Sequence, residues 1–202
     1  WIEGTPLAEY LENIREGRRP PVSPRDAVRL IHGLANAVCK LHQRQQIAHG
    51  DIQPPNVIIT DHPSRLVLID FGSAWTIEST AWREEGDGVH RCYAAPELQN
   101  KGATPVGFFA DQFSVSVLFY EFLTQQLPYG GLGGKAGLPV HISRAKDALA
   151  APSQVSPACR ALPSSLREGM DRAVLRGLAL DPADRYVDRH QWLNDLFAVH
   201  AR

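Results

Sequence analysis

Two polar stretches on either side of a short apolar segment constrain this chain more than any other feature. The first stretch is His49-Gly50-Asp51-Ile52-Gln53-Pro54-Pro55-Asn56, and the second is Asp70-Phe71-Gly72. Between them, Val57-Ile58-Ile59-Thr60 and Arg65-Leu66-Val67-Leu68-Ile69 read as two short strands, with a turn at Asp61-His62-Pro63-Ser64. The sequence therefore predicts a β hairpin with both polar stretches at the ends of one small ribbon.

Three oxygen-bearing side chains lie in these stretches, namely Asp51, Asn56 and Asp70. Mg²⁺ prefers carboxylate and amide oxygens, and a separate carboxylate can orient an attacking hydroxyl group. The set suits a magnesium-assisted phosphoryl transfer. Asp-Phe-Gly alone is a weak signal, because an ordinary turn after an apolar strand has a similar pattern, so the weight rests on its spacing from the first stretch.

The first stretch resembles the catalytic loop H-R-D-L-x-x-x-N of eukaryotic-type protein kinases, and the second is that family's D-F-G. His49, Asp51 and Asn56 match the loop, whereas Gly50 replaces its arginine and Gln53 its usual lysine. Further matches follow in the family's order: Tyr93-Ala94-Ala95-Pro96-Glu97 resembles A-P-E, Asp111-Gln112-Phe113-Ser114 the start of the central helix, and Asp181-Pro182-Ala183-Asp184-Arg185 the late arginine element.

The resemblance is to the bacterial-style Ser/Thr protein kinases, and it implies a mainly α (α+β) fold. We expect the family's large C-terminal lobe, a helical bundle with a small β hairpin at the catalytic loop. Residues 1–6 would be a remnant of the hinge between the two lobes, and residues 7–202 a single domain. The chain begins with Trp1 and contains neither a Gly-rich phosphate loop nor a Val-Ala-Ile-Lys strand, so we expect a fragment of a longer protein without the small N-terminal lobe.

Helices are predicted from apolar periodicity and from start and stop signals. Ser23-Pro24 is predicted to open a long helix, and Asp26 is placed to complete a capping box. His32 and His42 are interpreted as surface residues of this helix. A glycine-rich stretch, Gly130 to Lys135, lacks the spacing of a phosphate-binding loop and is interpreted as a flexible loop. Other helices are expected over Leu7 to Glu16 with a stop at Gly17, over Ala110 to Leu127, around Arg144 to Leu149, after a capping Ser164 or Ser165 with Leu166, Met170, Val174 and Leu178 on one face, and from about Asp188 with Trp192, Leu193, Leu196 and Phe197 inward.

The resemblance also implies a role for each site residue and implies ATP and Mg²⁺ as cofactors. Asp51 would accept the proton of the acceptor hydroxyl, and Asn56 and Asp70 would bind the metal ions. Ile58 would form the floor under the adenine, and the backbone of Ile2 would face the adenine edge. The structural roles fall to His49 and Phe71, which would stack in the core, to Asp111, which would fix the backbone near His49, and to Glu97 and Arg185, which would form a buried ion pair.

The departures from the family pattern affect the acceptor side of the site and its regulation. Gln53 is neutral where the lysine would hold the transferring phosphate, and His90 stands at the position of a threonine in the docking segment between Asp70 and Glu97. Gly50 offers no guanidinium to a phosphate on that segment, although Ser79 and Thr80 remain as hydroxyls there. We therefore expect activity that does not depend on phosphorylation of the segment.

Two other classes remain open besides a kinase for protein substrates. A pseudokinase or binding scaffold is favoured by Gln53 and by the missing lobe. A small-molecule phosphotransferase of the aminoglycoside-kinase type shares His-Gly-Asp…Asn, but Ala95-Pro96-Glu97 with Arg185 counts against it, because that class lacks this docking platform.

Composition excludes several partners. The 202 residues are 44% hydrophobic, which is enough for one well-buried core. The chain carries 21 basic and 22 acidic residues, for a net charge of −1. Neither nucleic acid nor an anionic membrane is therefore an expected partner. No apolar run approaches the roughly 18 residues of a membrane span. Cys39, Cys92 and Cys159 form neither a disulfide framework nor a metal motif, which favours a reducing cytoplasm.

Overall fold

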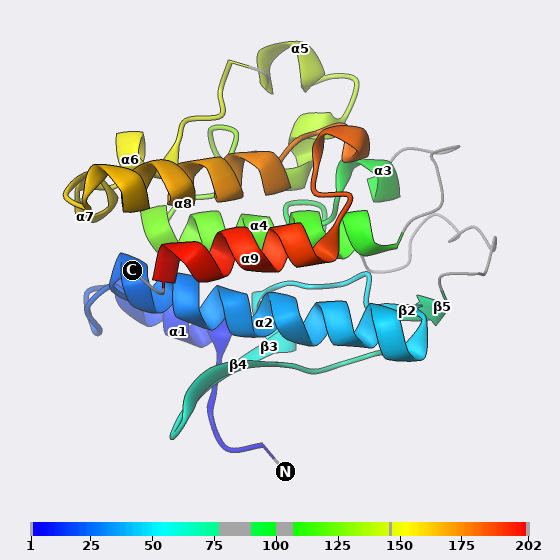
Figure 1. The fold of residues 1–202 in the computed structure, drawn as a ribbon, viewed down its shortest axis with the longest axis horizontal. Coiled ribbons are helices and arrows are strands. Elements are labelled where there is room, and N and C mark those ends of the chain that lie inside the picture. The colour runs from blue at the N-terminus through cyan, green and yellow to red at the C-terminus, as the bar shows by residue number, and fades with distance from the viewer. Residues whose placement is uncertain (1, 77–89, 100–106, 146, 201–202) are drawn as a thin grey trace.

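The computed structural model describes residues 2–76, 90–99, 107–145 and 147–200. The described chain is mainly helical with two small β-sheets, as the resemblance predicted (Figure 1). None of its helices is both long enough and apolar enough to cross a membrane. The elements are β1 (Thr5–Pro6), α1 (Leu7–Arg15), α2 (Pro24–Gln45), β2 (Ile47–Ala48), η1 (Pro54–Asn56), β3 (Val57–Asp61), β4 (Ser64–Leu68), β5 (Trp75–Thr76), α3 (Pro96–Gln99), α4 (Phe108–Thr124), η2 (Gly133–Gly137), α5 (Ile142–Ala145), α6 (Pro152–Val155), α7 (Pro157–Arg160), α8 (Ser164–Gly177), η3 (Pro182–Asp184) and α9 (Arg189–His200).

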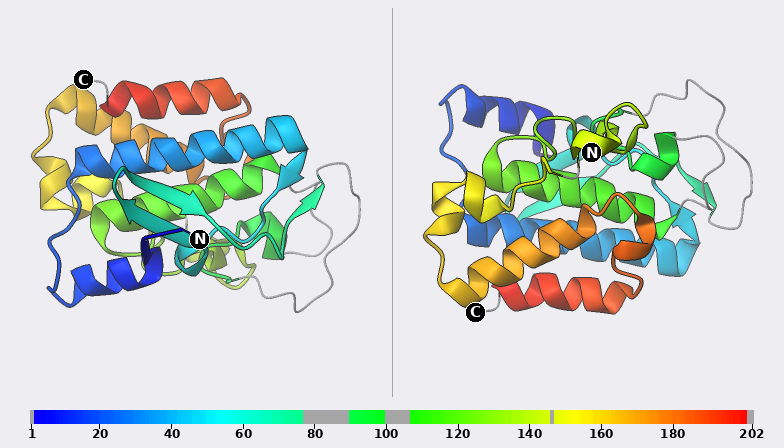
Figure 2. Two further views of the ribbon diagram at one scale, coloured as in Figure 1. Left: turned by 90° about the horizontal axis from the view of Figure 1, so that it is seen from below. Right: turned by 90° about the horizontal axis from the view of Figure 1, so that it is seen from above.

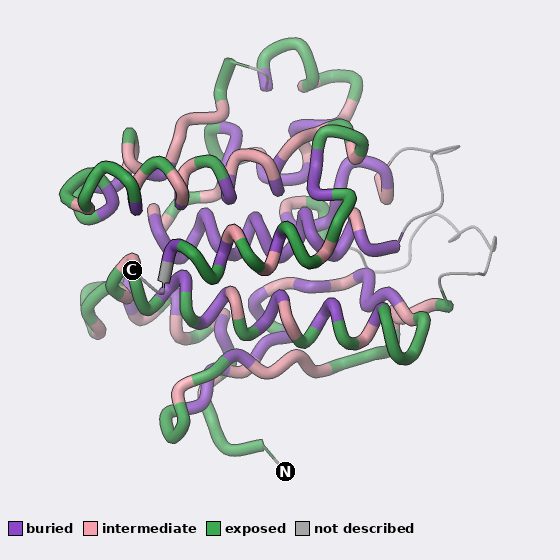
Figure 3. Tube along the Cα trace, viewed as in Figure 1, coloured by how far each residue is buried: buried purple, intermediate pink, exposed green. Residues whose placement is uncertain are grey.

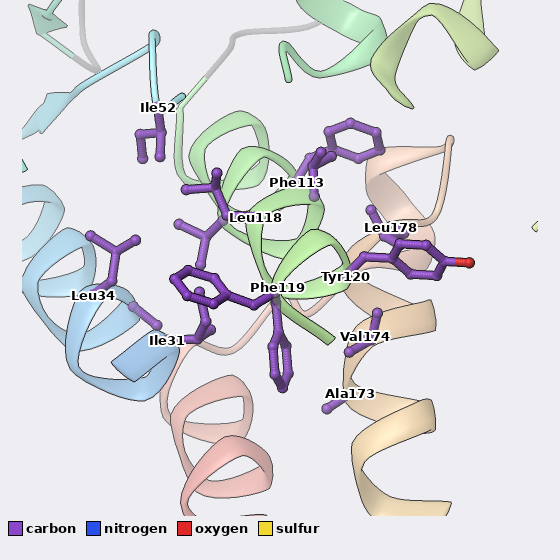
Figure 4. Close-up of a cluster of buried hydrophobic side chains, with 14 of the residues drawn as sticks. Ile31, Leu34, Ile52, Phe113, Leu118, Phe119, Tyr120, Ala173, Val174 and Leu178 are labelled. Carbon is purple, nitrogen blue, oxygen red and sulfur yellow. The ribbon is translucent and has the colours of Figure 1, made fainter. Parts of the chain in front are cut away.

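The central helix α4 is buried along almost its whole length. It lies between α2 and α8, and α9 packs against both of these helices (Figures 1 and 2). Figure 4 shows Leu118 of α4 on the side of α2, whereas Tyr120 lies on the side of α8. A helix that is apolar all round is stable only when it is enclosed, which is why α4 forms the centre of the bundle. It begins at Phe108 and ends at Thr124, slightly before the predicted limits.

Helix α2 presents one buried face to the bundle and one exposed face to solvent (Figure 3). Its start was predicted correctly, because the Ser23 hydroxyl accepts a hydrogen bond from the Asp26 backbone N–H at 3.1 Å. The carboxylate of Asp26 accepts from the same hydroxyl at 2.7 Å. The interpretation of His42 as a surface residue was wrong. His42 is fully buried, since it lies four residues after Val38 on the apolar face.

The predicted hairpin is present as β3 and β4, which pair antiparallel from Val57 opposite Leu68 to Asp61 opposite Ser64. The Ile69 N–H donates to the Asn56 carbonyl at 2.9 Å, so the ladder continues to the two polar stretches. A third strand, β1, pairs with β3. The second sheet joins β2 to β5, and no sequence signal indicated it.

The last helices depart from the predictions in three places. The short helix α5 begins before the expected position at Arg144. Helix α8 has Pro163 at its N-cap with no side-chain cap, so the predicted capping by Ser164 or Ser165 was wrong. In α9, Trp192 and Leu196 are buried as predicted, but Phe197 is 50% exposed. The side chain of Phe197 lies beside the His32 ring, 5.7 Å between centroids, because position 199 rather than 197 continues the buried face.

The glycine-rich stretch from Gly130 to Lys135 was expected to be a flexible loop, and this was wrong for its second half. The Gly134 N–H donates to the Cys92 carbonyl at 2.7 Å. A Cβ atom on Gly133 would lie 2.1 Å from the same carbonyl oxygen. These glycines therefore allow two backbones to approach closely, and the stretch carries η2 against the segment that leads into α3.

The buried ion pair expected between Glu97 and Arg185 is present and bidentate. Arg185 donates to the two Glu97 oxygens at 2.7 and 2.9 Å, and the Arg185 side chain has no exposed surface. The same guanidinium also donates to the carbonyls of Ala179 and Phe109, each at 2.7 Å. The pair thus connects α3, the start of α4 and the segment after α8.

Replacing Arg185 by alanine should lower the free energy of unfolding by roughly 3 to 5 kcal/mol, because Glu97 would keep its desolvation penalty without a partner. Urea titration followed by circular dichroism measures this loss. Arg29→Ala is the control, since its 3.4 Å contact with Asp26 lies on the surface, and its removal should cost less than about 1 kcal/mol. Equal losses in the two variants would contradict the assignment of a stabilising buried pair.

Candidate active site

The buried carboxylate of Asp111 holds the first polar stretch in place. Its two oxygens accept from the backbone N–H groups of His49 and Gly50, each at 2.8 Å. One of them also accepts from His42 Nε2 at 2.7 Å. Because Asp111 lies in the first turn of α4, the loop that carries Asp51 is fixed to the N-terminal end of the central helix.

His49 is a structural residue of the site. Its Nε2 contacts the Ile69 carbonyl at 3.1 Å, and its Nδ1 accepts from the Asp51 N–H at 3.3 Å. These two contacts require a neutral ring with the proton on Nε2. The rings of His49 and Phe71 are in contact, with centroids 4.9 Å apart, but they meet edge to face rather than stacked. Phe71 is also 49% exposed, so its ring does not lie in the core as expected.

The carboxylate of Asp51 is half-buried and is held by two amide side chains. Asn56 Nδ2 donates to Asp51 Oδ2 at 2.8 Å and to the Asp51 carbonyl at 2.9 Å. Gln53 Nε2 lies 2.9 Å from both carboxylate oxygens. Gln53, which stands where the family has lysine, therefore turns back to Asp51 and restricts the orientation of its carboxylate.

Asn56 and Asp70 are neighbours across the end of the hairpin, since Asn56 pairs with Ile69 through the backbone. The amide nitrogen of Asn56 is used by Asp51, which leaves its oxygen for a ligand. Asp70 has a φ of 60°, is exposed, and accepts from the Gly72 N–H through Oδ1 at 3.1 Å.

These oxygens fit a Mg²⁺ ion bound together with a nucleotide. Mg²⁺ usually takes one or two protein oxygens and completes its shell with phosphates and water. In the described ranges, no group of three or more His, Cys, Asp or Glu side chains could hold a metal ion by itself. The donor set of Asn56 and Asp70 is therefore of the kind that shares the ion with a bound phosphate.

Two residues were expected near the adenine, Ile58 on β3 and Ile2 before β1. Ile58 lies half-buried on β3 opposite Pro6 of β1, so the segment before α1 runs beside it. Gly4 is so close that a Cβ atom there would lie 2.6 Å from Ile58 Cγ2. Ile2 is 41% exposed and precedes β1.

Gly50 is required by its surroundings as well as by its backbone. It has a φ of +70°, and a Cβ atom there would lie 1.8 Å from the Trp75 ring. Trp75 is held over Gly50 because β5 pairs with β2, with Trp75 opposite Ala48. An aromatic ring thus fills the space into which any side chain at position 50 would extend. Ser79 and Thr80 lie outside the described residues, so the structure adds nothing to their expected role.

A small hollow of about 190 Å³ borders Gln53 and contains a charged group that sequence reasoning missed. Glu121 of α4 is buried, contacts Arg15, and accepts from the Tyr93 hydroxyl at 2.8 Å. Burial raises the pKa of the Glu121 carboxyl, although the Tyr93 hydroxyl and the Arg15 guanidinium oppose this shift. His90 lines the same hollow. The available signal was that Glu121 is the one acidic residue in the otherwise apolar or small stretch from Val115 to Leu123.

Comparisons with known proteins agree on one family. The pattern of the protein kinase domain matches residues 2–186. Similar relatives are serine/threonine-protein kinase PrkC of Bacillus subtilis, 26% identical over 92% of this chain and 26% of its own length, and PknE of Mycobacterium tuberculosis, 28% identical over 92% and 30%. A Corynebacterium efficiens protein, serine/threonine-protein kinases drp72, is 30% identical over 98% of this chain and 34% of its length. The chain thus spans about a quarter to a third of these relatives.

Gly50→Ala should lower the free energy of unfolding by more than Gly17→Ala. Both glycines have a positive φ, which costs an alanine roughly 1 to 3 kcal/mol, but a Cβ atom at Gly17 would meet nothing within 4 Å. Urea titration of the two variants measures the difference, which reports the clash with Trp75. In a Trp75→Ala background, Gly50→Ala and Gly17→Ala should lower the free energy of unfolding by similar amounts. A larger loss for Gly50→Ala in that background would contradict the assigned contact with Trp75.

Proposed function

The chain belongs to the protein kinase domain family, and on this premise we propose that it forms the large lobe of a Ser/Thr protein kinase that transfers a phosphoryl group from Mg-ATP to a protein hydroxyl. One observation carries the proposal. The carboxylate of Asp51 is held by the side chain of Asn56, and the backbone carbonyl of Asn56 accepts from Ile69, the residue before Asp70, at the end of the hairpin. This proximity supports a proton acceptor, Asp51, and two metal ligands, Asn56 and Asp70, at one edge of the fold.

In this mechanism the residues bind, orient and accept a proton. Asp51 receives the hydrogen bond of the acceptor hydroxyl and takes its proton as the oxygen attacks the terminal phosphate. Asn56 and Asp70 would hold Mg²⁺, which when bound neutralises charge on the phosphates. His49 and Asp111 act only by fixing the loop. We propose that Ile58 and the backbone at Ile2 contact the adenine, with residues 1–6 as the hinge segment.

The acceptor side lacks one positive charge relative to the family pattern, because Gln53 is neutral. Loss of one preorganised stabilising group typically lowers a rate by roughly 10² to 10³. His90 borders the same small hollow as Gln53, and a protonated imidazole there would return part of the charge. We propose that Gln53 mainly orients Asp51, and that the acceptor is a Ser or Thr hydroxyl, in keeping with the names of the relatives.

A catalytically silent binding scaffold is the second candidate, and one contact favours it. The amide nitrogen of Gln53 lies 2.9 Å from both oxygens of Asp51, so it competes with an acceptor hydroxyl for the proton-accepting group. A small-molecule phosphotransferase is less well supported, because the Glu97–Arg185 pair secures a docking platform of the kind that protein kinases use. We infer a cytoplasmic location, since ATP is the donor and the three cysteines are free thiols.

Residues 1–202 alone should transfer no phosphate, whereas a longer protein that includes the small lobe should do so. The phosphate-covering loop and its lysine belong to that lobe in the family, and both are proposed to come from outside this chain. Transfer of labelled phosphate from ATP to a general protein acceptor measures the difference. Asp51→Asn in the longer protein should abolish transfer. Asp70→Asn should abolish the metal-dependent turnover while leaving the fold, and hence the melting temperature, unchanged. Full activity in Asp51→Asn would contradict the role of Asp51, and no transfer by the unmutated longer protein would favour the scaffold.

Phosphorylation of the segment after Thr76 should not be needed for activity, because Trp75 occupies the space above Gly50 where an arginine would reach a phosphate. The longer protein before phosphatase treatment, the same protein after treatment, and its Ser79→Ala, Thr80→Ala double variant should all turn over at similar rates. A tenfold or greater difference between untreated and treated protein, about 1.4 kcal/mol of barrier, would contradict this.

A further inference from the structure

A second and larger hollow, of about 650 Å³, lies between α3, α5 and the segment that follows α8, and we call it the α3–α5 hollow. In Figure 1, α5 and α3 lie on the opposite side of α4 from α2 and the hairpin. The hollow shares no lining residue with the small hollow beside Gln53. The proposed catalytic function assigns it no role. Its apolar walls come from Pro96, Tyr129, Ile142, Leu149 and Leu180.

The α3–α5 hollow has a surplus of negative charge. Glu97 lines the hollow, but Arg185 neutralises the Glu97 carboxylate through two hydrogen bonds. Asp181 and Asp184 are both exposed at its edge. Asp181 uses one oxygen for the Ala183 N–H, at 2.9 Å, and within the described ranges the Asp184 carboxylate has no partner. Two carboxylates therefore face solvent beside an apolar wall, without a cation from the described chain.

Exposed branched side chains extend the apolar surface beyond the hollow itself. Ile142 is 41% exposed and lines the hollow, and Val140, two residues before it, is 74% exposed. Surface this apolar next to a charged depression is typical of an interaction site for a protein segment. A small cation would use the carboxylates but leave Val140 and Ile142 uncovered.

We propose that the α3–α5 hollow binds a peptide segment of a protein partner in which an arginine or lysine stands beside a branched aliphatic residue. The aliphatic stem of the basic residue lies along Leu149 and Leu180, and its charged head pairs with Asp184 and the remaining oxygen of Asp181. The neighbouring aliphatic side chain covers Ile142. The basic side chain thus meets the carboxylates and the aliphatic side chain meets Ile142, so the two contacts together orient the segment.

Fluorescence anisotropy with the full chain tests the proposal without nucleotide. The probe is a labelled peptide Gly-Ser-Leu-Arg-Ile-Ser-Gly, compared with Gly-Ser-Leu-Glu-Ile-Ser-Gly and with Gly-Ser-Ser-Arg-Ser-Ser-Gly. We expect the first peptide to bind at least tenfold more tightly than either of the others, and to weaken with added salt. Indistinguishable affinities, or no binding of the first peptide at millimolar concentration, would overturn the proposal.

Matched charge reversals locate the site. Asp184→Lys should weaken binding of the arginine peptide by tenfold or more, whereas Glu168→Lys, an exposed position on α8 outside the hollow, should leave it unchanged. Ile142→Glu should weaken binding through the loss of the apolar contact. Melting curves verify that each variant folds.

Asp51→Asn should bind the peptide normally, so a failure of the catalytic proposal and a failure of this one give different results. Equal weakening by Asp184→Lys and Glu168→Lys would mean general charge attraction and would refute the assigned site.

Discussion

The arrangement of the whole site depends on one buried carboxylate, that of Asp111. Burying a charge is costly unless hydrogen bonds compensate for it. Here the compensation comes from the backbone of His49 and Gly50 and from the ring of His42. These three donors belong to the loop and to α2, whereas Asp111 belongs to α4. The site therefore forms only when the loop and both helices have assembled, which couples formation of the site to formation of the core.

The first turn of α4 acts as a common reference for two distant segments. On one side Asp111 holds the loop that carries Asp51. On the other side the Phe109 carbonyl accepts from Arg185, which in turn holds Glu97 of α3. Because both attachments fall within three residues of a rigid buried helix, the loop that carries Asp51 and the start of α3 keep a fixed relative position. The proposed function needs this relation, because a bound protein segment would have to present its hydroxyl to Asp51.

The sequence predicted those parts of the fold that depend on local pattern. The hairpin, the start of α2 at Ser23 and the central helix follow from alternation, capping and continuous apolarity, and the spacing of the polar stretches located the site. The errors arose where contacts between distant residues decide the outcome. His42 lies on the apolar face of α2, where Asp111, 69 positions away, accepts from its buried ring. The glycines before α5 serve a close approach to Cys92. Glu121 was missed because its partners, Arg15 and Tyr93, come from two other segments.

The fit of Trp75 over Gly50 has a consequence for how this sequence can change over time. A side chain at position 50 would collide with the ring, and its backbone would also have to leave the left-handed region. A residue with a side chain, such as arginine, could therefore be accommodated at position 50 only after Trp75 had first been exchanged for a smaller residue. Substitutions at the two positions are tolerated in one order and not in the other. Descendants that keep the tryptophan are held to glycine, and they inherit whatever mode of control that glycine allows.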